Sequence, residues 1–149
     1  MFTIGVVIST YNNPRWLEKT LWGYLFQTHK PDEIVIADDG SNDDTRVLID
    51  SFRDRLPIKH VWHEDRGFQK SEILNKALVV CRSDYLIFTD QDCIPREDFI
   101  ATHYEYARKD GIRSALQDLL RPVRGGIDHQ VRAHPVHVRD RRGDHHDRR

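Results

Sequence analysis

Two carboxylates, Asp90 and Asp92, stand two residues apart after an apolar run, Tyr85–Phe88, that predicts a buried strand. Residues i and i+2 of a strand point to the same side, so a strand continuing through this segment would aim both carboxylates at one object. Paired carboxylates repel unless a cation lies between them, and a hard divalent metal with a diphosphate suits that place. The alternative is that both are turn or helix-capping residues ahead of Pro95, and the pair alone leaves both interpretations open.

Two other polar clusters also follow predicted strands. The segment from Ser9 to Asn12 follows a strand at 3–9, and Asp38 and Asp39 follow a strand at 33–37. A carboxylate there can accept hydrogen bonds from a base N–H or from ribose hydroxyls, but Asp-Gly-Ser-Asn is also strong turn chemistry. One aspartate could therefore shape the turn while the other binds a ligand.

Basic and histidine side chains give weaker signals. Arg66, Gly67 and Lys70 offer positive charge and a close-approach glycine, although basic residues at the start of a helix are common. Four histidines have no partners that require catalysis and are interpreted as surface or interfacial residues: His29, His60, His63 and His103.

Alternating strands and helices must position these clusters. Hydrophobic periodicity predicts strands at 3–9, 33–37, 58–62 and 85–88, with helices at about 14–27, 47–52, 73–80 and 96–108. This order predicts an α/β fold with a mostly parallel sheet, helices on both faces, and a more exposed strand at 58–62. Ligands bind such sheets at the carboxyl ends of the strands, so the clusters should converge on one edge.

Composition restricts the class of protein. The 149 residues predict one compact domain, and the net charge of −1 gives no case for nucleic acid or a membrane surface as a partner. Cys81 and Cys93 lack metal-site spacing and favour a reducing cytosol. No apolar stretch approaches the roughly 20 residues of a membrane span. The N-terminus lacks the basic region with which a signal peptide begins, so no signal peptide is expected.

The composition changes after Gly111. Residues 112–149 are rich in Arg, His and Asp and contain no aromatic residue, so we predict a domain at 1–111 followed by a disordered or non-native tail, including one translated out of frame. A basic nucleic-acid arm is disfavoured by the interleaved aspartates, and the histidine spacing fits no standard metal-ligand pattern.

The strand-end motifs, in their order along the chain, resemble the inverting glycosyltransferase family 2, especially galactosyl- and chondroitin-polymerase-type members. The resemblance covers about residues 3–108 and rests on Val7–Asn12, Asp38–Ser41, Gly67–Gln69 ahead of Asn75, and Asp90-x-Asp92 followed by Cys93-Ile94-Pro95. It implies the N-terminal half of a GT-A fold, a nucleotide-binding α/β sandwich.

The resemblance also implies the roles of residues. The nucleotide pocket would be lined by Ser9, Thr10, Tyr11, Asp39, Gly67, Lys70 and Asp90. Asp39 would hydrogen-bond uracil, and Asp90 would lie near the ribose and the metal. Asp92, with Asp90, would bind the Mn²⁺ or Mg²⁺ that bridges the diphosphate.

The implied reaction is transfer of a sugar from a UDP-sugar to a glycan or lipid-linked acceptor, with inversion, in cell-wall or polysaccharide synthesis. Inversion needs a general base, which the family supplies from its acceptor-binding half. No such base is identified here, because Glu97 and Asp98 look like first-turn charges of a helix. We therefore expect a truncated form that binds donor and metal in the cytoplasm or peripherally at the inner membrane face, without an acceptor site.

Two rival functions remain. The chain could be a non-catalytic binding module whose acidic edge is structural. A nucleotidyltransferase shares the α/β architecture and an acidic metal site, but a glycine-rich basic phosphate loop would be expected after its first strand, and Ser9–Asn13 is not one.

Overall fold

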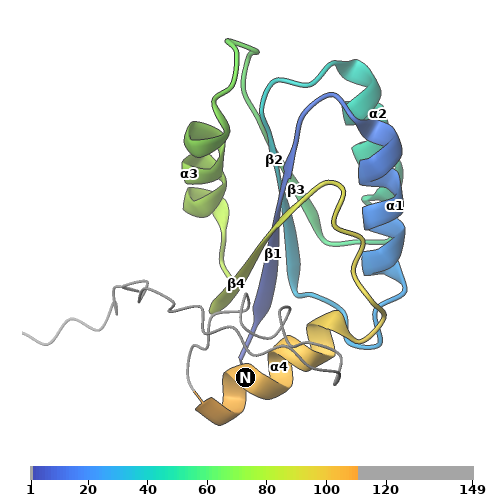
Figure 1. Cartoon of the computed structure of the whole chain (residues 1–149), viewed down its shortest axis with the longest axis vertical. Coiled ribbons are helices and arrows are strands. Elements are labelled where there is room, and N and C mark those ends of the chain that lie inside the picture. Colours follow the sequence, from blue (N-terminus) through green and yellow to red (C-terminus); the bar gives the residue numbers. More distant parts are fainter. Residues whose placement is uncertain (1, 111–149) are drawn as a thin grey trace, which may run out of the picture. The chain divides into compact units, whose positions relative to one another are not determined.

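The computed structural model describes residues 2–110, in which strands and helices alternate as predicted (Figure 1). The strands are β1 (Ile4–Thr10), β2 (Glu33–Asp38), β3 (Ile58–Trp62) and β4 (Tyr85–Asp90). The helices are α1 (Pro14–Leu25), α2 (Asp43–Phe52), α3 (Lys70–Val80) and α4 (Phe99–Asp110). The predicted tail at 112–149 and its boundary lie outside the described residues and stay predictions.

The four strands form one sheet in the order β3-β2-β1-β4, and every neighbouring pair is parallel. Parallel strands need a crossover between them, and the helices provide it. In Figure 1, α1 and α2 lie on one face of the sheet and α3 lies on the other. The carboxyl ends of all four strands therefore lie at the same edge of the sheet.

The core has two layers because successive strand residues point to opposite faces. Ile4, Val6 and Ile8 of β1 pack in the larger cluster with residues of α1 and α2, whereas Val7 packs in a second cluster with Ile73 of α3. The two inner strands, β1 and β2, are buried along their whole length. A strand covered on both faces needs the continuous β-branched sequences seen in β1 and β2.

The prediction that Tyr85–Phe88 forms a buried strand is wrong in its burial. Only Ile87 of β4 is buried, and the Phe88 side chain is 51% exposed. The reason is that β4 lies at the edge of the sheet, with no strand paired to its outer side among residues 2–110. The more exposed strand predicted at 58–62 is confirmed as β3, the opposite edge.

None of the helices in the described part of the chain combines the length and the apolar character that crossing a membrane requires.

Candidate functional site

A cavity of about 360 Å³ opens at the carboxyl ends of β1, β2 and β4. Its lining includes every residue that the sequence singled out as a nucleotide or metal contact: Ser9, Thr10, Tyr11, Asp39, Gly67, Lys70, Asp90 and Asp92. Sequence reasoning missed three further lining residues, Phe68, Ile73 and Gln91. The predicted convergence of the strand-end clusters is therefore present, while the role of each residue stays a prediction.

The carboxyl end of β1 is joined by hydrogen bonds to the carboxyl end of β4 and to the turn that follows it. Ser9 and Asp90 are register partners, and the Ser9 hydroxyl donates to Oδ1 of Asp90. The Thr10 hydroxyl donates to Oε1 of Gln91 at 2.5 Å, and the Tyr11 backbone N–H donates to the same oxygen at 3.2 Å. These hydroxyls hold the wall of the cavity together.

Asp90 is an ionised acceptor held by two donors. Nζ of Lys70, the first residue of α3, lies 2.5 Å from Oδ1 of Asp90, which also accepts from Ser9. Burial raises the pKa of Asp90, but the hydrogen bonds from Lys70 and Ser9 and the lysine charge outweigh it, so this pKa lies below its usual value. The cavity wall therefore carries a fixed negative charge with a cation beside it.

Asp92 reaches the cavity by a different route from the predicted strand alternation. β4 ends at Asp90, and the backbone N–H of Cys93 donates to the Asp90 carbonyl at 3.0 Å, which closes a turn containing Asp92. The Thr20 hydroxyl of α1 donates to the Gln91 carbonyl at 2.6 Å and fixes this turn. Asp92 is therefore a turn residue that also lines the cavity, and its role toward a metal stays a prediction.

The two aspartates at the end of β2, Asp38 and Asp39, have different surroundings. Asp38 is 1% exposed, and its carboxylate accepts from the Ser41 backbone N–H at 2.8 Å and contacts Nε2 of His60 at 2.8 Å. Asp39 lines the cavity. This division agrees with the expectation that one aspartate shapes the turn while the other is available to a ligand.

The interpretation of His60 and His63 as surface or interfacial residues is wrong. The His60 side chain is only 8% exposed and contacts Asp38. The His63 side chain is only 10% exposed and contacts Asp39. The signal depends on the strand order: once β3 is known to lie beside β2, residues near the carboxyl ends of the two strands lie side by side. Histidines at the end of β3 are therefore expected beside aspartates at the end of β2.

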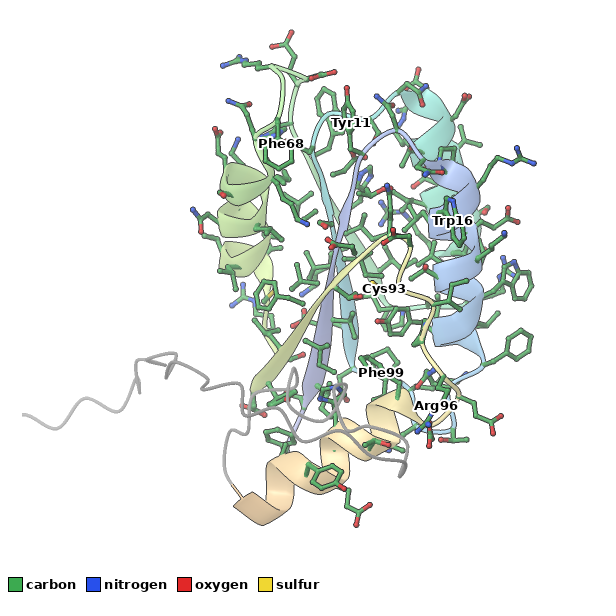
Figure 2. The ribbon with its side chains drawn as sticks, in the orientation of Figure 1. Tyr11, Trp16, Phe68, Cys93, Arg96 and Phe99 are labelled. Carbon is green, nitrogen blue, oxygen red and sulfur yellow. The ribbon has the colours of Figure 1, made fainter. Side chains whose placement is uncertain are left out.

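The loop between β3 and α3 closes another side of the cavity. The Tyr11 hydroxyl donates to Oδ2 of Asp65 at 2.9 Å, and the Gly67 N–H donates to Oδ1 of Asp65 at 2.9 Å. The hydrogen bond from Gly67, followed by that from Tyr11, lowers the pKa of Asp65. Tyr11 and Phe68 lie at the same end of the sheet (Figure 2), and Phe68, 89% exposed, offers an open aromatic ring beside the cavity.

The carboxylates are compatible with a metal completed by other ligands. Within residues 2–110, no three His, Cys, Asp or Glu side chains are grouped closely enough to hold an ion unaided. Mg²⁺ is usually bound by one or two carboxylates together with water and substrate phosphates. Asp90 and Asp92 supply that number of hard oxygen ligands in one cavity.

Comparison with known proteins identifies the family. The sequence profile of glycosyl transferase family 2 matches residues 5–136, most of the chain. The chain belongs to glycosyltransferase family 2.

Curated relatives share part of the sequence of this family member. It is 35% identical over 99 residues to validoxylamine A glucosyltransferase of Streptomyces hygroscopicus subsp. limoneus, covering 65% of this chain and 22% of that protein. It is 33% identical over 93 residues to hyaluronan synthase of Pasteurella multocida, covering 62% of this chain and 10% of that protein. The chain thus spans less than a quarter of the length of these two relatives.

Solved glycosyltransferase structures share the fold. Staphylococcus aureus TarS 1–349 in complex with UDP-GlcNAc superposes with a TM-score of 0.65 at 22% identity, covering 72% of this chain and 31% of that one. Mannosyltransferase PcManGT from Pyrobaculum calidifontis, in complex with GDP-Man and Mn²⁺, gives 0.63 at 25% identity, covering 73% and 33%. The predicted GT-A fold is confirmed for the described part of the chain.

Proposed function

We propose that the cavity binds the UDP part of a nucleotide sugar together with Mn²⁺ or Mg²⁺, as the donor site of an inverting sugar transfer to a glycan or lipid-linked acceptor. One observation carries the proposal: Asp39, Lys70 and the Asp90–Asp92 pair come from three different segments and line one cavity. Family membership and the UDP-GlcNAc complex of TarS, a protein of the same fold, support it.

In this proposal the nucleotide lies between the segments after β1 and β2. Asp39 accepts a hydrogen bond from the ring N–H of uracil, since an ionised carboxylate is an acceptor only. Ser9 and Thr10 approach the nucleoside mainly through the backbone, because their hydroxyls already donate to Asp90 and Gln91. Tyr11 and Phe68 offer aromatic faces at the cavity mouth, and Gly67 lets the backbone come close.

Asp90 and Asp92 would hold the divalent metal. A bound metal neutralises negative charge that develops on the departing diphosphate. Lys70 adds a second positive charge at the same wall through its contact with Asp90. The Mn²⁺ in the PcManGT complex, a protein of the same fold, supports the choice of metal.

We propose further that the acceptor and its general base are provided by residues outside 2–110. The first two carboxylates after the Asp-x-Asp segment, Glu97 and Asp98, do not line the cavity, and Asp98 is paired with Arg96 at 2.8 Å. The described part of the chain would then bind donor without activating an acceptor hydroxyl.

Calorimetric titration of the full 149-residue chain with UDP, with and without Mn²⁺, tests the proposal. We expect binding that depends on Mn²⁺ and that weakens at least about tenfold in Asp92→Asn, which keeps the shape of the side chain but removes its charge. Asp43→Asn is the matched control, because Asp43 is an exposed carboxylate of α2 that does not line the cavity.

The two parts of the proposal fail separately. Equal affinity of the wild type and Asp92→Asn for UDP with Mn²⁺ would overturn the metal role. Absence of nucleotide binding in the presence of Mn²⁺ would overturn donor binding itself and favour a non-catalytic interaction module.

A further inference from the structure

His63 belongs to a network of polar side chains that leads from the surface of α3 to the cavity. Its Nε2 lies 2.7 Å from Oδ1 of Asp39, and its Nδ1 lies 3.1 Å from Nζ of Lys76. Lys76 is held in turn by Glu72, one turn earlier in α3, at 2.7 Å. A chain of contacts therefore runs from the outer surface of α3 through the imidazole to the cavity wall.

The network determines where the imidazole carries its proton. A lysine ammonium can only donate, so Lys76 requires Nδ1 of His63 to accept. The ring proton of the neutral imidazole then lies on Nε2, and His63 donates to Asp39. The direction of this hydrogen bond follows from the lysine alone.

The carboxylate of Asp39 is held at both oxygens. Oδ1 accepts from His63, and Oδ2 accepts from the backbone N–H of Gln69 at 2.9 Å. A carboxylate has about four lone-pair sites, so acceptor capacity remains for a ligand while the two donors prevent rotation of the group. Recognition of a ring N–H needs that fixed direction, because the strength of a hydrogen bond falls steeply with its angle.

We infer that His63 is a positioning residue that orients Asp39 for recognition of a base with a ring N–H, such as uracil. This inference rests on the proposed donor site. It adds a structural reason for nucleotide selectivity, namely the fixed orientation of the Asp39 carboxylate. Cytosine and adenine present an acceptor nitrogen at the corresponding edge, so a fixed carboxylate would repel them.

The neighbouring His60–Asp38 pair provides a control for the His63–Asp39 pair. His60 contacts Asp38 at 2.8 Å, and both side chains are as buried as those of the His63–Asp39 pair. Asp38 does not line the cavity. Removal of either histidine leaves an aspartate with only its backbone donor, Ser41 for Asp38 and Gln69 for Asp39. Only the loss of His63 affects a carboxylate that lines the cavity.

The experiment compares His63→Leu, His63→Gln and His60→Leu by calorimetry with UDP and CDP in the presence of Mn²⁺. We expect His63→Leu to weaken UDP binding about tenfold and to reduce the preference for UDP over CDP, since a hydrogen bond to a charged group is lost. Glutamine can place its amide N–H near the position of Nε2, so His63→Gln should recover most of the affinity. His60→Leu should lower the unfolding temperature but keep the UDP:CDP ratio.

A double variant and a second probe separate positioning from a general loss of structure. In an Asp39→Asn background, His63→Leu should weaken UDP binding no further, and binding of Mn²⁺–pyrophosphate should be the same in all variants. If the wild type binds UDP and His63→Leu keeps the affinity and the UDP:CDP ratio, the inference is overturned while the donor site stands. If the wild type binds neither nucleotide, the donor site itself fails. Equal loss of UDP affinity in His60→Leu would also overturn the inference.

Discussion

At the scale of single residues, two glycines, Gly40 beside Asp39 and Gly67 in the cavity lining, both have positive φ but different surroundings. Gly40 has φ of +94° and Gly67 has φ of +85°, values that side chains rarely adopt. A Cβ at Gly40 would lie 2.6 Å from the Cα of Asp65, whereas a Cβ at Gly67 would meet nothing within 4 Å. Gly40 is thus required twice, for its conformation and for the contact between the turn after β2 and the loop after β3.

Alanine substitutions should separate these two requirements. Gly67→Ala should cost about 1 kcal/mol of unfolding free energy, the ordinary strain of a left-handed residue. Gly40→Ala should cost about 1–3 kcal/mol more, because the new methyl group meets backbone that must move. Urea denaturation of both variants measures the difference. Equal destabilisation would show that the contact with Asp65 is loose.

Sequence reasoning predicted the residues that line the cavity better than it predicted the side chains that hold them in place. Side chains such as Asp39 and Asp90 end strands, and the topology of a parallel sheet determines that strand ends meet. His63 was missed because its position depends on which strand neighbours β2, and that order is a property of the whole sheet. The partner of Asp90, Lys70, was expected only as a nearby positive charge, whereas it contacts the carboxylate directly.

At the scale of elements, one carboxylate joins three segments at the opposite end of the sheet from the cavity. Glu33 begins β2, and its side chain accepts from Nζ of Lys59 in β3 at 2.7 Å. It also accepts from the backbone N–H groups of Arg82 and Ser83, both at 2.6 Å, in the connection between α3 and β4. Burial raises the pKa of Glu33, but these donors outweigh it and lower the pKa to about 2.

Glu33 should make stability depend on acid. Its folded pKa lies below its unfolded value of 4.5, so its contribution is fully present above pH 4.5 and is lost as the pH falls towards 2. We expect Glu33→Gln to cost about 2 kcal/mol at pH 7 and much less near pH 2.5, since the charge is then being lost in the wild type too. Glu64→Gln, at an exposed carboxylate paired with Arg66, is the control.

Urea denaturation of wild type and both variants at the two pH values makes this measurement. A loss of stability in Glu33→Gln that is the same at pH 7 and pH 2.5 would contradict the assignment of the acid dependence to this residue.

The elements themselves were predictable from local patterns. Each strand was predicted within two residues, because continuous β-branched runs and flanking turn residues mark short buried strands. α4 begins at Phe99, later than the predicted Arg96, since Arg96 and Asp98 pair with each other ahead of the helix. The exposure of β4 was not predictable, because an apolar strand sequence does not reveal which strand will be its neighbour.

At the scale of the whole molecule, β4 presents an open strand edge within the part of the chain that the structure describes. Its outer backbone groups have no strand partner there, and Phe88 is half exposed beside them. Unpaired strand edges with apolar side chains are templates for pairing with another chain.

We therefore expect the 149-residue chain to associate with itself as its concentration rises, and Phe88→Lys to reduce this association, since a charge at an edge strand opposes pairing. Phe26→Lys should not reduce it, because Phe26, an aromatic residue that is 68% exposed, lies at the end of α1 and not on a strand edge. Light scattering across a concentration series measures the effect. A monodisperse wild type at all concentrations, or equal effects of the two variants, would contradict this expectation.

The hydrogen bonds between the segments that follow the strands also bear on dynamics. Each of the four segments is bonded to at least one other, through the pairs Ser9–Asp90, Thr10–Gln91, Tyr11–Asp65, Asn12–Ser41 and Gln69–Asp39. Loops linked in this way open together, so the amide hydrogens of Tyr11, Asn12 and Gln69 should exchange with deuterium at similar rates, as one cooperative unit. A ligand that enters such a site meets loops whose conformational entropy was already lost during folding, and little of its binding free energy is spent on ordering them.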